Sequence, residues 1–194
     1  WVAAIFLLIC LIGPMRARGA TPLFMLPFLA FFPASVATNC TRRARLLWLR
    51  AGTDRRDLYT LAERWGLRSS MVAWVISAAV VVAFSLRAGS FAPGDILLYT
   101  LAQAATAAVM FYGALALTRG WSVHDVVLAF LFGAPAIAQA VMMPTLLRGD
   151  DRVVVALVIA LVAFALVLRW HGTRQWRTLD WRVVKIPQWH GRTG

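Results

Sequence analysis

The sequence predicts an all-α, polytopic membrane helix bundle of about six spans, forming a single domain over residues 1–194. Hydrophobic residues make up 61% of the chain, charged residues make up 14%, and the mean hydropathy is +0.72. A soluble protein of this length needs more polar side chains than that to cover its surface. Because lipid is the solvent that tolerates such a composition, we expect a membrane domain with no soluble enzyme domain attached.

Apolar segments recur at about the length that a bilayer requires. A hydrocarbon core about 30 Å thick takes roughly 20 apolar residues in helical form, since lipid cannot satisfy open backbone groups. The segment 1–13 is only part of a span, as a fragment of a longer protein would leave. The other predicted spans are 21–39, 70–88, 96–118, 123–147 and 152–170.

Helix breakers and caps divide these segments. Pro22, Pro27 and Pro33 lie in the second segment, and each removes a backbone donor, so we expect a kinked or broken helix there. Asp95 ends the turn before the fourth span and is placed to cap that helix.

Basic residues gather at the ends of the spans. Eight of them lie between Arg42 and Arg68, and six lie between Arg169 and Arg192. Alternating spans put the segment 41–69 and the tail 171–194 on one side, which the positive-inside rule predicts to be cytoplasmic. This placement favours membrane lipid as a partner over nucleic acid, because no nucleic-acid-reading motif accompanies the charge. One lysine against 19 arginines suggests a GC-rich bacterial genome, and hence a bacterial inner membrane.

The segment 41–68 contains the pattern of a cytoplasmic amphipathic helix. Thr53 or Asp54 can cap it and Gly66 can end it. Apolar residues recur at the i, i+3, i+4 and i+7 spacing of one helical face: Leu58, Leu61, Ala62 and Trp65. Such a helix lies on the inner leaflet with its arginines toward the headgroups, or docks a partner protein, or does both.

The tail combines tryptophans with basic residues. Trp side chains favour headgroup depth, where Arg pairs with phosphate, so we expect the tail 171–194 to lie along the membrane surface. The tryptophans concerned are Trp170, Trp176, Trp181 and Trp189.

Candidate catalytic and metal-binding groups are sparse. No ionisable residue lies deep in a predicted span, and the cysteines and histidines lack metal-ligand spacing. His124 and Asp125 adjoin one another, and we favour an interfacial helix start over a catalytic pair. We therefore expect no catalytic activity, metal or cofactor in this chain itself.

Some polar and small residues within the spans suit contacts between helices. Gln103, Thr106 and Gln139 can bond a neighbouring helix or, alternatively, line a substrate path. The small pair Ala104 and Ala108 suits close packing within the bundle or against a second membrane subunit.

Residues 46–58 read Leu-Leu-Trp-Leu-Arg-Ala-Gly-Thr-Asp-Arg-Arg-Asp-Leu. This order of residues resembles the segment between the second and third spans in permease subunits of ATP-binding-cassette exporters. The shared features are leucines, a short break, a polar turn, and then Arg and Leu. That family also has about six spans per unit. The resemblance implies that Thr53–Trp65 is a coupling helix. The residues that it would present to an ATPase subunit are Arg55, Arg56, Leu58, Leu61, Ala62 and Trp65.

The same resemblance implies a permease that exports a hydrophobic or lipid-like substrate between two membrane halves. ATP would bind to the ATPase subunit, because this chain contains no nucleotide-binding motif. Two alternatives stay open at this point. One is an accessory scaffold subunit of a larger membrane complex, and the other is a membrane-embedded lipid enzyme that would use His124 and Asp125.

Overall fold

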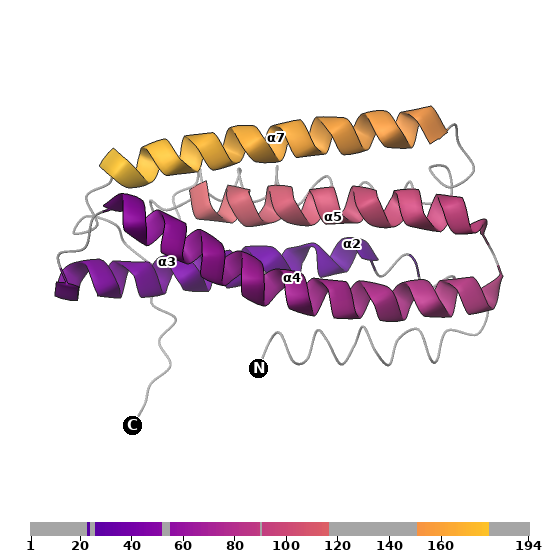
Figure 1. Ribbon diagram of the computed structural model, residues 1–194, viewed down its shortest axis with the longest axis horizontal. Coiled ribbons are helices and arrows are strands. Elements are labelled where there is room, and N and C mark those ends of the chain that lie inside the picture. The colour runs from indigo at the N-terminus through magenta and orange to yellow at the C-terminus, as the bar shows by residue number, and fades with distance from the viewer. Residues whose placement is uncertain (1–22, 24–25, 52–54, 90, 117–150, 179–194) are drawn as a thin grey trace, which may run out of the picture.

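The structure is a computed structural model that describes residues 23, 26–51, 55–89, 91–116 and 151–178. Within these ranges the chain is helical and contains no strand (Figure 1). The helices are α2 (Leu26–Leu29), α3 (Phe31–Ala51), α4 (Arg55–Ala88), α5 (Pro93–Ala116) and α7 (Asp151–Thr178). The predicted all-α class is therefore confirmed for this part of the chain.

In the described part of the chain, three helices are long and apolar enough to cross a membrane: Asp57–Ala88 within α4, Pro93–Ala116 and Asp151–Thr178. They contain most or all of the predicted spans 70–88, 96–118 and 152–170. The predicted spans 1–13 and 123–147 lie outside the described residues, so the structure supports three spans and leaves the number six as a prediction.

The second predicted segment is broken, as its prolines predict. α2 ends at Leu29 and α3 begins at Phe31, and the amide of Ala30 donates to the carbonyl of Pro27 over 3.2 Å. Pro33 is the third residue of α3. An amide in the first turn has no intrahelical acceptor, so the missing donor of Pro33 costs the helix little there.

The segment 41–69 is more helical than the sequence predicts. α3 continues to Ala51, and α4 runs without interruption from Arg55 to Ala88. The predicted end of a separate amphipathic helix at Gly66 is therefore wrong, because Gly66 lies within α4. At 34 residues, α4 is about 51 Å long, so its first turns extend beyond a hydrocarbon core of about 30 Å.

Gly66 allows α4 to approach its neighbours closely. A Cβ atom at this position would lie 2.6 Å from Cε2 of Phe111 on α5 and 3.5 Å from Sγ of Cys40 on α3. Three helices thus meet at a residue with no side chain. This packing requirement explains why a glycine, normally unfavourable within a helix, is found there.

The turn between α4 and α5 depends on a second glycine. Gly89 has a φ of 64°, the left-handed conformation that commonly ends a helix, and its amide donates to the carbonyl of Leu86 over 3.2 Å. α5 then begins at Pro93, so Asp95 lies within the first turn. The prediction that Asp95 caps the helix is therefore wrong, because the helix starts two residues earlier.

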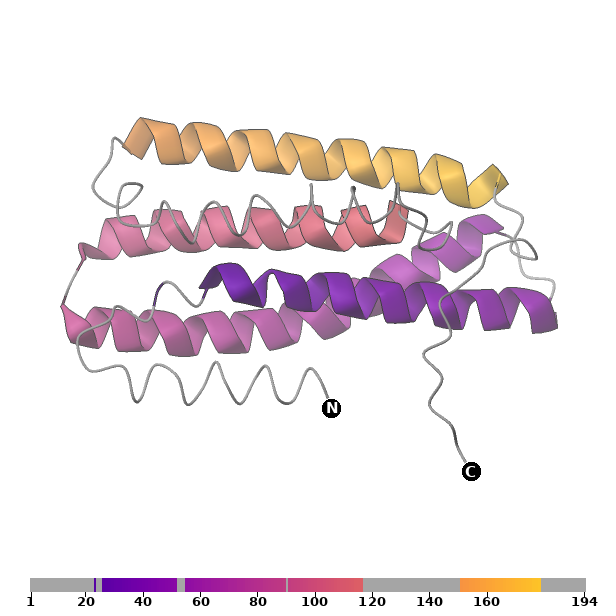
Figure 2. The ribbon, with the colours of Figure 1, turned by 180° about the vertical axis from the view of Figure 1, so that it is seen from behind.

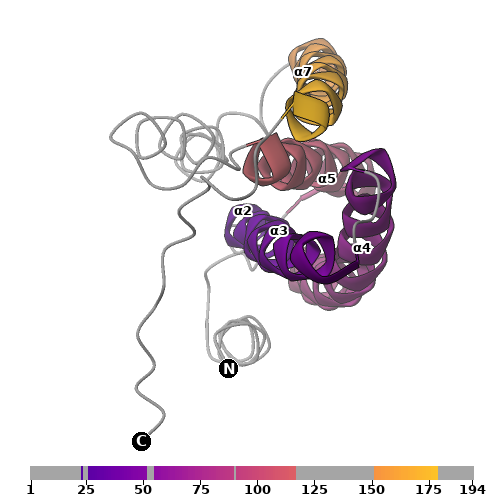
Figure 3. The same ribbon diagram turned by 90° about the vertical axis from the view of Figure 1, so that its left-hand side faces the viewer.

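α5 lies at the centre of the described bundle and packs against α2, α3, α4 and α7. Figure 2 shows α2 and the first part of α3 between α5 and the second half of α4, and Figure 3 shows α7 on the outer side of α5. α4 is inclined, so that its start lies near α7 and its end lies far from it (Figure 1). α3, α5 and α7 all run toward the side at which α4 begins (Figure 1), and we name this side, where α4 carries Arg55, Arg56, Arg64 and Arg68, the basic end of the bundle.

Gly66→Ala should destabilise the fold by about 1–3 kcal/mol, because the added methyl group must displace the buried Phe111 ring. Thermal unfolding in detergent measures the effect. Gly94→Ala is the control, since nothing lies within 4 Å of a Cβ atom there. Equal melting temperatures for the two variants would contradict the close approach of α4 and α5.

Candidate functional site

Among the described residues, a group of side chains joined by polar contacts lies at the basic end and is centred on the carboxylate of Glu63. Nε of Arg169 on α7 donates to Oε1 over 2.6 Å, and Nη2 donates to Oε2 over 3.3 Å. The Glu63 side chain is 8% exposed, whereas that of Arg169 is 50% exposed. The guanidinium thus binds both carboxylate oxygens, a geometry that gives strong, directional ion pairs.

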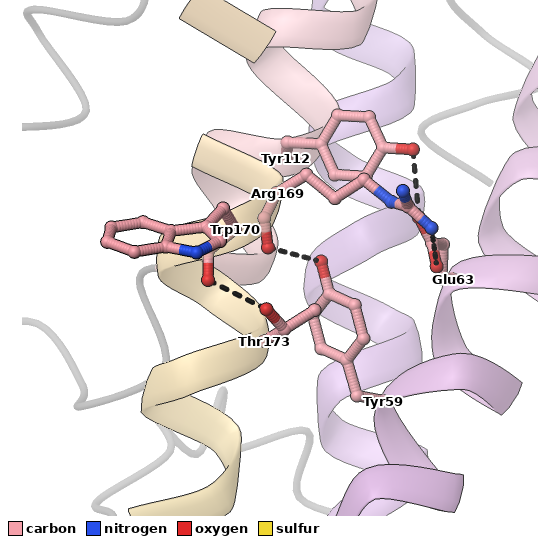
Figure 4. A network of polar contacts seen from close by, with 6 residues as sticks. All are labelled: Tyr59, Glu63, Tyr112, Arg169, Trp170 and Thr173. Atoms are coloured by element: carbon pink, nitrogen blue, oxygen red, sulfur yellow. Dashed lines mark hydrogen bonds and ion pairs between the residues drawn. The ribbon is translucent and has the colours of Figure 1, made fainter. Parts of the chain in front are cut away.

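Two tyrosines complete this network (Figure 4). The hydroxyl of Tyr112 on α5 donates to Oε1 of Glu63 over 2.9 Å, and the hydroxyl of Tyr59 on α4 donates to the Arg169 carbonyl over 3.4 Å. Burying a carboxylate is costly unless it is paired and hydrogen-bonded. Here α5 and α7 supply those partners, so one charged group links three helices. We name Tyr59, Glu63, Tyr112 and Arg169 the Glu63 network.

Trp176 packs beside the Glu63 network and is fully buried. Its Nε1 donates to the Leu115 carbonyl over 2.9 Å, and its ring meets Tyr59 edge-on with 5.3 Å between centroids. Gly172, one turn earlier, leaves room for Tyr59, which would lie 3.4 Å from an added Cβ atom. The prediction that Trp176 anchors a tail along the membrane is therefore wrong. Residues 171–178 continue α7, and the hydrogen-bond partner of the indole is inside the protein.

The Glu63 network lies where the uncharged runs of two helices stop. In α7 the run 153–168 ends at Arg169, and in α4 the run 69–86 begins just after Arg68. Uncharged runs of this length suit a hydrocarbon core, so a membrane around them would place the Glu63 network near the headgroups. Trp65 and Trp170, which are 59% and 55% exposed, lie within two residues of Glu63 and Arg169, at the depth that tryptophan prefers.

The predicted docking residues fall on two different faces of α4. Leu58 and Ala62 are buried, whereas Leu61 and Trp65 are 41% and 59% exposed. Arg55 and Arg56 begin α4. The predicted stripe is thus split, because α4 buries the face that also carries Tyr59, Glu63 and Gly66 against its neighbours. On α4 a partner could reach Leu61 and Trp65, and the docking role itself stays a prediction.

Two of the three predicted substrate-path residues lie inside the described bundle. Gln103 and Thr106 on α5 are fully buried, and the Thr106 hydroxyl donates to the Ala102 carbonyl over 2.9 Å. Their role in a substrate path stays a prediction. Gln139, His124 and Asp125 lie outside the described residues.

Metal and thiol chemistry find little support in the described ranges. No group of three or more His, Cys, Asp or Glu side chains there could hold a metal ion. Burial raises the pKa of the Cys40 thiol, and the charge of Arg43 opposes this shift in part. His171 shares a 2.8 Å hydrogen bond with Gln175 on the exposed side of α7.

The Glu63 network was not predicted from the sequence, because Glu63 lies in a segment that contains eight arginines and no partner stands out among them. A signal was present, since Glu63 is the only glutamate in the chain. It also lies four residues after Tyr59 and three before Gly66, on one side of a helix. The ion-pair partner of Glu63 could not be predicted from the sequence, because Arg169 is 106 residues away along the chain.

Comparison of the chain with protein-family models, curated proteins and solved structures finds no match. Fold and site together define the class: a protein whose described part is helical, with three helices that can cross a membrane and an ion pair between α4 and α7 that α5 joins through Tyr112. Its function must be argued from its own residues.

Arg169→Gln should lower the free energy of unfolding by about 1–3 kcal/mol, because Glu63 would stay buried without its cation. The double variant Glu63→Gln with Arg169→Gln should lose less, since no buried charge remains. Denaturant unfolding in detergent micelles measures both.

The control for this experiment is Arg64→Gln, which changes an exposed arginine beside Glu63 and should stay within about 0.5 kcal/mol of the parent. If Arg169→Gln were no more destabilising than Arg64→Gln, the ion pair would not hold α4 to α7.

Proposed function

We propose that this chain is a permease subunit of an ATP-driven transporter that exports a hydrophobic or lipid-like substrate. The observation that carries the proposal is the continuity of α4. The segment expected to dock an ATPase forms the first turns of the same 34-residue helix that contains a candidate membrane span. A partner that displaces the start of such a helix also displaces the span, because no break intervenes to absorb the motion.

The Glu63 network supports the same proposal. It fixes the start of α4 to Tyr112 on α5 and to Arg169 on α7. A displacement applied at Leu61 or Trp65 is therefore transmitted to α5 and α7 as well as α4. α5 and α7 pack extensively against each other. Such coupling is what a transporter needs if nucleotide hydrolysis on one polypeptide is to move helices of another.

The exposed surface at the start of α4 has the chemistry of a docking site. Leu61 and Trp65 supply apolar area, and the neighbouring Arg64 and Arg68 are exposed. An aromatic anchor surrounded by cations suits an acidic partner groove. Under the positive-inside rule the basic end faces the cytoplasm of a bacterium, where ATP is present.

An accessory scaffold subunit is the second candidate, and the outer face of α7 favours it. This helix buries little of its apolar surface within the described chain. Its exposed residues include Val155, Ile159, Val162 and Leu166. Lipid covers such a face in a permease, and neighbouring subunits would cover it in a scaffold.

Purification of the tagged protein from its native membrane in mild detergent, with mass spectrometry of bound proteins, tests the proposal. A permease should retain a stoichiometric ATP-binding-cassette ATPase. The double variant Leu61→Ala with Trp65→Ala should reduce the retained ATPase by about tenfold or more, since buried tryptophan anchors often contribute at least 2 kcal/mol.

The matched control is Leu97→Ala, which removes an exposed leucine from α5 at the opposite end of the bundle and should leave ATPase binding unchanged. A fixed set of other membrane subunits without an ATPase would favour the scaffold. Undiminished ATPase binding by the double variant would exclude docking through the start of α4.

A further inference from the structure

Trp170 and Arg174 form a stacked pair on the outside of α7, next to the Glu63 network. The guanidinium carbon of Arg174 lies 3.8 Å from the centroid of the Trp170 ring. Both side chains are exposed, and Trp170 points away from Glu63 (Figure 4). The pair is one helical turn apart, so the backbone of α7 fixes its spacing.

Stacking prepares Arg174 to bind an anion. A guanidinium that lies over an indole gains a cation–π contact and keeps the N–H groups at its edge available. Arg174 makes no ion pair with another residue in the described part of the chain. Its planar fork of donors matches the oxygens of a phosphate group.

The depth of the pair indicates which phosphate it meets. Trp170 and Arg174 lie two and six residues after the uncharged run 153–168, whose helix is about 24 Å long and would cover most of a hydrocarbon core of about 30 Å. Their level is therefore that of the lipid phosphates, where tryptophan is enriched. A soluble phosphate would find the same donors, but it lacks the acyl chains that can pack along the exposed apolar face of α7.

The surrounding charge favours an anionic lipid over a zwitterionic one. Exposed arginines on α3 and α4 lie within two residues of members of the cluster that packs around Trp176: Arg42, Arg43, Arg64 and Arg68. Among the described acids at the basic end, Glu63 is already paired and Asp57 alone is exposed. The local field is thus positive and attracts the anionic headgroups of a leaflet.

We propose that Trp170 and Arg174 bind the phosphate group of an anionic phospholipid at the basic end, with the acyl chains lying along α7. The site is independent of the transport proposal, because it needs neither an ATPase nor a substrate. It also gives a lipid-binding role to one of the predicted tail tryptophans, whereas Trp176 serves the protein core.

Native mass spectrometry of the full chain in detergent, titrated with phosphatidylglycerol or phosphatidylcholine, tests the site. Phosphatidylglycerol should bind more tightly. Arg174→Gln should weaken its binding about fivefold, the factor that one cation near an anionic surface contributes. Trp170→Leu should weaken binding in the same direction, because Arg174 loses the ring that orients it.

Arg87→Gln is the matched control, since it removes an exposed arginine from the opposite end of the bundle and should leave the affinity unchanged. Thermal unfolding of each variant confirms that these surface substitutions keep the fold. Equal affinities of the Arg174→Gln and Arg87→Gln variants would overturn the proposal, as would equal binding of the two lipids. Displacement of phosphatidylglycerol by millimolar inorganic phosphate would identify a free anion site instead.

Discussion

The structure depends on the need to neutralise one buried carboxylate. Glu63 lies where α4 meets α5 and α7, and at 8% exposure its side chain cannot rely on water. Arg169 and Tyr112 must therefore approach it, and this requirement fixes the level at which the three helices meet. The same level separates the apolar runs of α4 and α7 from their polar ends. One charged contact thus joins α4, α5 and α7 at the level where the uncharged runs of α4 and α7 end.

Apolar run length predicts where the described helices are long and apolar enough to cross a membrane, because a bilayer would impose a length and forbid open backbone groups. The proline-rich break before α3 was equally predictable from local chemistry. Helix continuity through Gly66 was not. Glycine is a helix terminator by propensity, and only the distant Phe111 ring makes its small size a packing requirement. Local rules fail there because a tertiary contact decides the outcome.

The predicted functional residues show the same division. Periodicity placed Leu58, Leu61, Ala62 and Trp65 on one stripe, but two of them are buried and two are exposed. That prediction assumed a helix whose apolar side is covered by a single surface. In the structure α4 packs against three helices: α3, α5 and α7. Side chains that a sequence places on a free surface can thus be internal once neighbouring helices are counted. The Glu63 network could not be predicted from the sequence, because its members are far apart along the chain.

The parallel course of α3, α5 and α7 has an electrostatic consequence. A helix carries about half a negative elementary charge at its carboxyl end and half a positive charge at its amino end. Three carboxyl ends and one amino end meet at the basic end, which leaves roughly one negative charge of backbone origin there. Arginines at that end, such as Arg174, therefore face a field set by the peptide groups themselves. Arginines at this end, whose charge the positive-inside rule uses to predict orientation, thus also complement the summed macrodipole of the bundle.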